Sequence, residues 1–293
     1  MDELSSYLLK RYPGQYITGE DDCNLLLWGV VKEGLKHPKL ATLNVGVEYD
    51  PFCSDRKYVV DALNHKYAAD PGFQKLFLFT KQISNYSKLP IAVIAYPALR
   101  AEYDGKWENT ETVYKPGEVN FFLDKNDGNS GIVSGAKLRD EIYRYLGCTY
   151  TDAGTSKDKN KTLADYFHFW SRSFLSKNIV KFDIDGFFKG AEKNVLIEIK
   201  RSSIPPIPLW RPQYDKPDYV LQHEFARQIH AEFWLLHHEK GACHDNTEIS
   251  FFDIGDVDLS MENKYDFLIC REVNLQMKLT GRGGLTEKIE GMM

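Results

Sequence analysis

The chain has 293 residues, of which 43% are hydrophobic and 13% aromatic, and its formal net charge is −5. This composition excludes a disordered protein, and the length allows one large domain or two ordinary ones. The apolar runs are far shorter than the roughly 20 residues of a membrane-spanning helix, so no membrane partner is expected. The negative charge argues against non-specific coating of nucleic acid but leaves room for a local phosphate-binding patch.

The cysteines predict a reducing compartment. There are five of them, an odd number, and no pair has CxxC spacing. A disulfide framework is therefore not expected. The first residues, MDELSSYLLKRYPG, also lack the apolar core of a secretory signal. We expect a cytoplasmic protein.

The N-terminal part, residues 1–127, is predicted to be an α/β region with a recognition or regulatory role. The spacing of its apolar residues predicts both helices and strands, and polar segments that contain glycine predict turns between them. The linker candidate is Asp124–Ser134. Helices are expected at Leu4–Arg11, Asn24–Leu35, Arg56–Ala68 and Phe73–Tyr86, and strands at Ile91–Tyr96 and Glu118–Leu123.

The second part, residues 134–293, is predicted to be a separate mixed α+β domain. Ser134 is a suitable N-cap for a helix that ends near Gly147, and Thr162 is a suitable cap for a second helix. Further strands are expected at Ser250–Ile254 and Phe267–Val273. Between the second helix and these strands come strands at Val180–Phe188 and Val195–Arg201, a proline-rich loop at Ile204–Pro217, and a long helix at Asp218–Glu239.

Acidic residues share one face of the first of these strands. Val180, Phe182 and Ile184 alternate with polar residues, so Asp183 and Asp185 point the same way. The following strand has the same period of two, which puts the side chains of Glu198 and Lys200 on one face.

A hairpin turn would bring these faces together. The segment KGAEKN suits such a turn. If the turn centres between Ala191 and Glu192, Asp185 lies across from Glu198, and Asp183 lies across from Lys200. Cross-strand Cβ atoms are about 5 Å apart, so two carboxylates could share one divalent cation. A lysine beside them could orient or deprotonate a water molecule, which is what phosphodiester hydrolysis needs.

This hairpin resembles the core of the PD-(D/E)XK nuclease superfamily, which includes many restriction endonucleases. Asp185 matches the first acidic position, Glu198 the second and Lys200 the lysine; Ile184 stands where many members have proline. The similarity extends over about Ser134–Gly241. It implies a restriction-endonuclease-like fold, with a central mixed sheet flanked by helices. The implied activity is that of an Mg²⁺-dependent deoxyribonuclease, with Mn²⁺ as a substitute for Mg²⁺.

The resemblance also suggests further site residues. Glu141 corresponds to an acid that family members often carry on the preceding helix, and Gln222 or Gln228 to a glutamine on the following one. Asp183 remains an alternative or additional metal ligand. Arg201 and Arg211 are candidates for binding substrate phosphates.

Several alternatives stay open at this stage. The charged face of the hairpin could simply be solvated. The segment HHEKGACH, from His237, could suggest zinc, although a polar helix end followed by a turn fits it better. The resemblance favours a restriction-type or phage-defence endonuclease acting on double-stranded DNA, and a homodimer is compatible with that role. An exonuclease or repair nuclease, or a non-catalytic nucleic-acid-binding module, would have the same core.

Overall fold

The computed structural model describes two compact units. Its described residues are 2–18, 23–30, 39–49, 56–97, 120–124, 130–146, 167, 170–171, 175, 179–202, 216–241, 249–253 and 276–279. The units interleave along the chain. Unit 1 comprises Met1–Asp21, Val31–Pro38 and Asp183–Met293, and unit 2 comprises Asp22–Val30 and Lys39–Phe182. Whether two domains divide at residues 127–134 stays a prediction.

Unit 1 is built on a mixed sheet with strand order β1-β8-β9-β10-β11-β12. Only β9 and β10 are parallel neighbours, and α7 connects them; the other neighbours are antiparallel. This β9–α7–β10 segment is a crossover unit, as parallel strands require. The strands are β1 Tyr16–Ile17, β8 Gly186–Lys189, β9 Asn194–Ser202, β10 Ala231–Glu239, β11 Ile249–Asp253 and β12 Gln276–Leu279.

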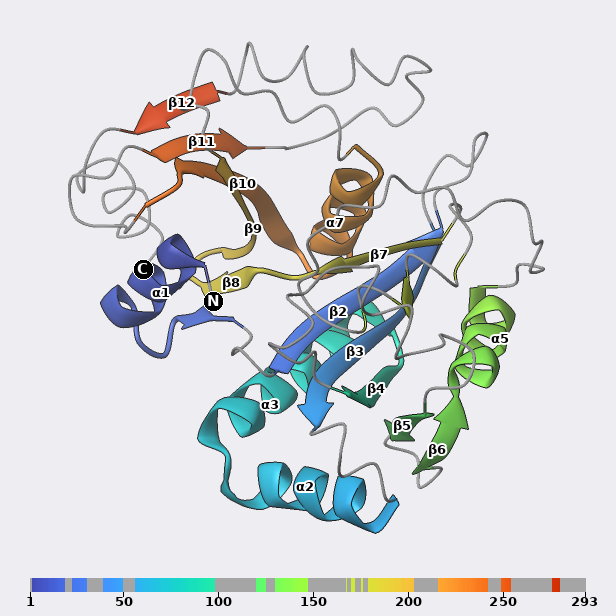
Figure 1. Cartoon of the computed structure of the whole chain (residues 1–293). Coiled ribbons are helices and arrows are strands. Elements are labelled where there is room, and N and C mark those ends of the chain that lie inside the picture. Colours follow the sequence, from blue (N-terminus) through green and yellow to red (C-terminus); the bar gives the residue numbers. More distant parts are fainter. Residues whose placement is uncertain are drawn as a thin grey trace. The chain divides into compact units, whose positions relative to one another are not determined.

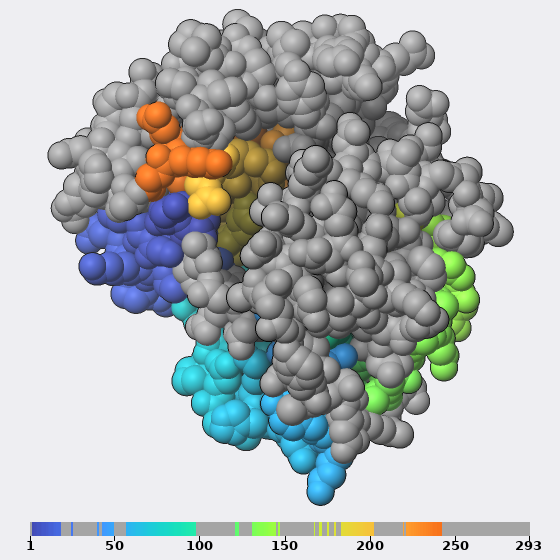
Figure 2. Space-filling view, viewed as in Figure 1, coloured from blue at the N-terminus to red at the C-terminus, as the bar shows by residue number. Residues whose placement is uncertain are grey.

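Helices α1 (Glu3–Arg11) and α7 (Lys216–Gln228) lie on either side of β9 and β10 (Figure 1). Leu4 and Leu8 of α1 join a buried cluster with Ile197, Ile199 and other residues of that sheet face. Side chains alternate along a strand, so the even-numbered residues of β9 face the opposite way, toward α7. Figure 2 shows the N-terminal segment, in blue, directly against yellow and orange atoms of the later part of unit 1.

Unit 2 contains most of a second mixed sheet, with strand order β6-β5-β4-β3-β2-β7. Strands β3 and β4 are parallel, and helices α2 and α3 connect them. The strands are β2 Cys23–Val30, β3 Lys39–Tyr49, β4 Ile91–Pro97, β5 Asn120–Asp124, β6 Ser130–Ser134 and β7 Ile179–Asp183. The helices are α2 Arg56–Ala69, α3 Pro71–Ser87 and α5 Gly135–Leu146.

Several predicted elements are confirmed, because their signals are local. Helix α3 begins after Asp70, whose side chain accepts a hydrogen bond from the backbone N–H of Phe73. Ser134 caps α5 through a 3.3 Å bond from the N–H of Lys137. The mixed α/β class is therefore correct. The predicted helix after Thr162 and the strand at Phe267–Val273 fall wholly or largely outside the described residues.

One predicted helix in unit 2 is wrong. Residues 24–30 of the expected helix Asn24–Leu35 belong to strand β2, which pairs with β3. A short apolar run has no period that separates helix from strand, and pairing with β3 decided the outcome. The linker candidate Asp124–Ser134 includes the paired ends of a β5–β6 hairpin, and its role as a domain boundary stays a prediction. Its asparagines and glycines suit a hairpin turn as well as they suit a linker.

The expected helix Asp218–Glu239 is also wrong in its second half. Helix α7 ends at Gln228, His230 has a left-handed φ of 54°, and β10 begins at Ala231. From Phe233 to His238 every residue is buried. A continuous buried run is typical of a central strand that is covered on both faces. None of the helices in the described part of the chain is both long and apolar enough to cross a membrane.

Candidate active site

Asp185 lies where the first predicted strand is interrupted. The expected strand Val180–Phe188 is two strands, because β7 ends at Asp183 and belongs to the second sheet, while β8 begins at Gly186. The turn between β8 and β9 is centred as predicted, since the N–H of Gly190 donates to the Lys193 carbonyl. The ladder ends with Gly186 opposite Ile197. Asp185 lies just beyond the end of this ladder, so its position opposite Glu198 stays a prediction.

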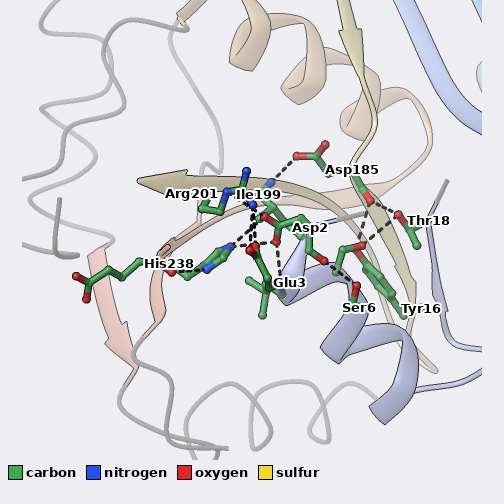
Figure 3. Close-up of polar contacts among 12 residues, drawn as sticks. Asp2, Glu3, Ser6, Tyr16, Thr18, Asp185, Ile199, Arg201 and His238 are labelled. Atoms are coloured by element: carbon green, nitrogen blue, oxygen red, sulfur yellow. Dashed lines mark hydrogen bonds and ion pairs between the residues drawn. The ribbon is translucent and has the colours of Figure 1, made fainter. Parts of the chain in front are cut away.

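The Asp185 carboxylate closes the end of this ladder. Its Oδ2 atom accepts a 2.7 Å hydrogen bond from the backbone N–H of Ile199, beyond the last β8–β9 pair (Figure 3). Burial raises the pKa of Asp185 well above its ordinary value, and the negative charge of Glu198 raises it further. The positive charge of Lys200 and the Ile199 bond act in the opposite direction. Asp185 thus faces a second carboxylate in a poorly solvated place.

Glu198 is buried and held on both of its carboxylate oxygens. It is 5% exposed. Its Oε1 lies 2.7 Å from Nζ of Lys200, and its Oε2 accepts a 2.7 Å bond from Nε2 of Gln222. If the charged face of the hairpin were simply solvated, the Glu198 carboxylate would be exposed to water. Its burial excludes that alternative for Glu198.

Helix α7 covers the sheet face that carries Glu198 and Lys200. Gln222, 1% exposed, points from the helix to Glu198, whereas Gln228 bonds instead to Glu224 on its own helix. Of the two glutamines left open by the sequence, the structure brings Gln222 to the acidic pair. Lys200 Nζ also lies 5.7 Å from the ring centroid of buried Tyr219, a cation–π contact that helps fix the ammonium group.

Two predicted acids are placed differently. Asp183 ends β7, so the expected position opposite Lys200 is wrong; the chain leaves the β8–β9 ladder before reaching it. Its negative charge still contributes to the raised pKa of Asp185. Glu141 is on α5, in unit 2, whereas Asp185 and Glu198 are in unit 1. The metal role of Asp183 and the catalytic role of Glu141 stay predictions.

Arg201 points away from this face. It follows Lys200 in β9, so its side chain emerges on the α1 side of the sheet. There its Nη1 atom lies 2.9 Å from a carboxylate oxygen of Glu3 (Figure 3). The geometry gives Arg201 an ion pair with α1 and does not support its predicted phosphate contact. Arg211 lies outside the described residues.

The histidines at the end of β10 are fully buried, which corrects the predicted polar helix end. His238 Nε2 is 3.0 Å from Oδ1 of Asp2, on the α1 side. His237 pairs in register with Lys200 and so shares the face of the candidate site. Burial, and next the neighbouring His238, lower the pKa of His237 to about 4, which keeps its imidazole neutral. Cys243 and His244 lie outside the described residues.

The donor set fits a hard divalent cation. Asp185 and Glu198 offer carboxylate oxygens, which Mg²⁺ and Mn²⁺ prefer, and their mutual repulsion would be relieved by a positive charge between them. A carboxylate oxygen has two lone-pair sites, so the contacts of Glu198 with Lys200 and Gln222 leave acceptor capacity. Asp2, Glu3 and His238 form another group with ligand atoms within 4.8 Å, but they already pair with one another and with Arg201.

Sequence reasoning missed the residues that support Asp185 from the N-terminal segment. The Thr18 hydroxyl donates a 2.6 Å bond to the Asp185 carbonyl, and the Tyr16 hydroxyl donates one of 3.3 Å. These residues are 167 and 169 positions away in the sequence. Nothing local to Tyr16 or Thr18 signals this contact.

Comparison of the chain with models of known protein families and with curated protein sequences finds no match. The functional assignment therefore depends on the geometry of the site and on the motif itself.

Proposed function

We propose that this protein is a metal-dependent deoxyribonuclease of the PD-(D/E)XK type, with a restriction-endonuclease-like core formed by β8, β9, α7 and β10. The observation that supports the proposal is the contact of buried Glu198 with both Lys200 and Gln222, together with the bond from the Ile199 N–H to the Asp185 carboxylate, whose pKa is affected by the charges of Glu198 and Lys200. A raised carboxylate pKa beside a specific charge partner is typical of active sites. The expected setting is cytoplasmic, and the expected substrate is double-stranded DNA.

Asp185 and Glu198 would hold Mg²⁺, or Mn²⁺ in its place. When bound, the ion supplies Lewis-acid stabilisation of the phosphoryl oxygens and lowers the pKa of a bound water molecule. The ion pair and the ring of Tyr219 keep Lys200 Nζ beside the acidic pair, where it can orient the attacking water and offset negative charge on the phosphate. Gln222 fixes the Glu198 carboxylate through its amide.

The neighbouring charges make these roles mutually dependent. Without a cation, the Asp185 carboxyl has a raised pKa because it is buried and faces Glu198. A cation favours the ionised form of both groups, so binding is coupled to proton release from Asp185. While no cation is bound, the ammonium group of Lys200 partly compensates the negative charge of Asp185 and Glu198. This arrangement suits a site that must switch between metal-free and metal-bound states.

The direct test is a cleavage assay on supercoiled plasmid, linear duplex, single-stranded DNA and RNA, with Mg²⁺, Ca²⁺ or EDTA. We expect cleavage of duplex DNA with Mg²⁺, little with Ca²⁺ because its looser coordination positions water poorly, and none with EDTA. Discrete fragments indicate an endonuclease, and stepwise loss from ends indicates an exonuclease. Binding to DNA without any product under all conditions would overturn the proposal in favour of a binding module.

A matched pair of lysine variants guards against a contaminating nuclease. Lys193 lies on the same hairpin but is exposed and pairs with Glu232 at 2.7 Å. Lys193→Ala should cleave like the wild type, and Lys200→Ala should not. Equal activity in all three preparations would count against Lys200 as a catalytic residue and against this chain as the source of the activity.

A further inference from the structure

We infer that Thr18 and Tyr16 are positioning residues of the candidate site, which hold the backbone of Asp185 so that its carboxylate meets Glu198. The inference deepens the proposed function, and its structural part can be tested without any activity. It arises from the break between β7 and β8, where Asp185 lies outside both strands and so lacks the ladder bonds that normally fix a strand residue.

The short strand β1 substitutes for those ladder bonds. It pairs with β8 through Tyr16 opposite Phe188 and Ile17 opposite Phe187. Continued one step, this register brings Thr18 to Gly186, and the Thr18 hydroxyl reaches past it to the Asp185 carbonyl at 2.6 Å. The ladder is thus extended by a side chain at the residue where the strand is interrupted.

Hydrogen bonds among three hydroxyl groups hold the side chains of Thr18 and Tyr16 in place. The Ser5 hydroxyl of α1 donates to Thr18 Oγ1 at 3.2 Å, and its oxygen lies 3.0 Å from the hydroxyl oxygen of Tyr16. Burial raises the pKa of Tyr16 well above its ordinary value, so this phenol stays protonated and remains a donor. Figure 3 shows Tyr16 and Thr18 converging on the Asp185 carbonyl oxygen, while its carboxylate extends to Ile199.

Gly186 makes the close approach possible. A Cβ atom built on this residue would overlap the Tyr16 hydroxyl and ring. Only glycine therefore allows the tyrosine to lie against the backbone next to Asp185. Asp185 is then held at both ends, at its carbonyl by Thr18 and Tyr16 and at its carboxylate by the N–H of Ile199.

The experiment compares Thr18→Val, which keeps the shape but removes the hydroxyl, with Thr18→Ser, which keeps the donor. The structural readout is hydrogen exchange of the Ile199 amide in the full-length, metal-free protein, relative to core amides of β9 and β10. In Thr18→Val we expect Ile199 to exchange about tenfold faster than in the wild type, because the carboxylate that protects it is released. Thr18→Ser should exchange like the wild type. Tyr16→Phe should have a smaller effect than Thr18→Val, because its bond is longer.

The functional readout is the rate of Mg²⁺-dependent DNA cleavage by the same variants. Misplacement of Asp185 should lower the rate of Thr18→Val by about tenfold to a hundredfold, with recovery in Thr18→Ser. Unchanged Ile199 exchange in Thr18→Val, or equal acceleration of all core amides, would overturn the inference, whatever the activity. Selective Ile199 exchange in a protein whose wild type cleaves nothing would uphold the positioning and refute the nuclease function.

Discussion

The side-chain amide of Gln222 donates a 2.7 Å hydrogen bond to Oε2 of Glu198, and both residues are buried. This contact joins α7 to the face of β9 that carries Glu198 and Lys200. Because a buried carboxylate is costly without donors, the bond stabilises the fold as well as the geometry of the site. Through this bond the crossover helix α7 and the β8–β9 hairpin both contribute residues to the candidate site.

Removing that amide should destabilise the protein. Gln222→Leu leaves Glu198 Oε2 without its donor, and we expect a loss of about 1–3 kcal/mol in the free energy of unfolding, measured by urea denaturation. Gln228→Leu is the matched control, because Glu224 also bonds Arg227 and keeps that donor. Equal losses in the two variants would mean that the Gln222 contact has no special weight.

Asp185→Asn should instead stabilise the metal-free protein. Asparagine can still accept the bond from Ile199, and it removes a buried charge that faces Glu198. The free energy of unfolding of the variant at neutral pH should therefore be higher than that of the wild type. Because the folded pKa of Asp185 is raised, the wild type binds its proton more tightly when folded, so this site favours folding as pH falls through that pKa.

The pH dependence provides the control for this prediction. The stability advantage of Asp185→Asn should shrink as pH falls and the wild-type carboxyl becomes protonated. Asp61→Asn, at an exposed position on α2, should change little at any pH. Thermal melts of the three proteins between pH 4 and about 8 measure this, and a destabilised Asp185→Asn at neutral pH would contradict the burial argument.

His237 should produce a pH effect of opposite sign. Its pKa is lowered from 6.5 to about 4 in the folded state, so the unfolded chain binds the additional proton between these values. The protein should lose stability as pH falls through this window, by on the order of 1 kcal/mol or more. His237→Gln should flatten that part of the profile, whereas His65→Gln, at an exposed position, should leave it intact. Identical profiles for both variants would refute the assignment.

Lys200→Ala should lower the rate of DNA cleavage by on the order of a hundredfold or more, because a positioned cation near the reacting phosphate is lost. DNA binding, measured by fluorescence anisotropy with Ca²⁺ present, should change far less. Lys200 is partly exposed, so its truncation leaves no core cavity, although Glu198 loses its ion pair. Asp183→Asn should cost less, since Asp183 does not lie opposite Lys200. Equal, mild effects of both substitutions would argue against a catalytic lysine.

The sequence predicted the hairpin because its determinants are local. Alternation of polar and apolar residues set the faces of β9, and the KGAEKN turn set the register in which Gly186 pairs with Ile197, next to Asp185 and Glu198. Gln222 could be named only as one of two glutamines, since helical spacing does not say which of them meets β9. The register of α7 against the sheet decides that.

Other features depend on contacts distant in sequence, and these were missed or mispredicted. The break at Asp185 follows from β7 joining another sheet, and the hydroxyls that hold it come from the N-terminal segment. The sequence predicts helix where β10 lies, because Phe233–Leu236 has no period that separates helix from strand. Pairing with β9 makes this segment a strand. Arg201 was expected near phosphate, but strand alternation and Glu3 place it on the other face.

The central claim is that Asp185 and Glu198 together hold a divalent cation, and the most direct measurement is Mn²⁺ binding followed by the paramagnetic resonance signal of the free ion. The wild type should take up Mn²⁺, Mg²⁺ should compete with it, and affinity should rise with pH as Asp185 ionises. Asp185→Ala and Glu198→Gln should each abolish this uptake, while Arg201→Gln, on the opposite face, should preserve it. No uptake by the wild type, or uptake by either the Asp185 or the Glu198 variant that equals the wild type's, would contradict the account.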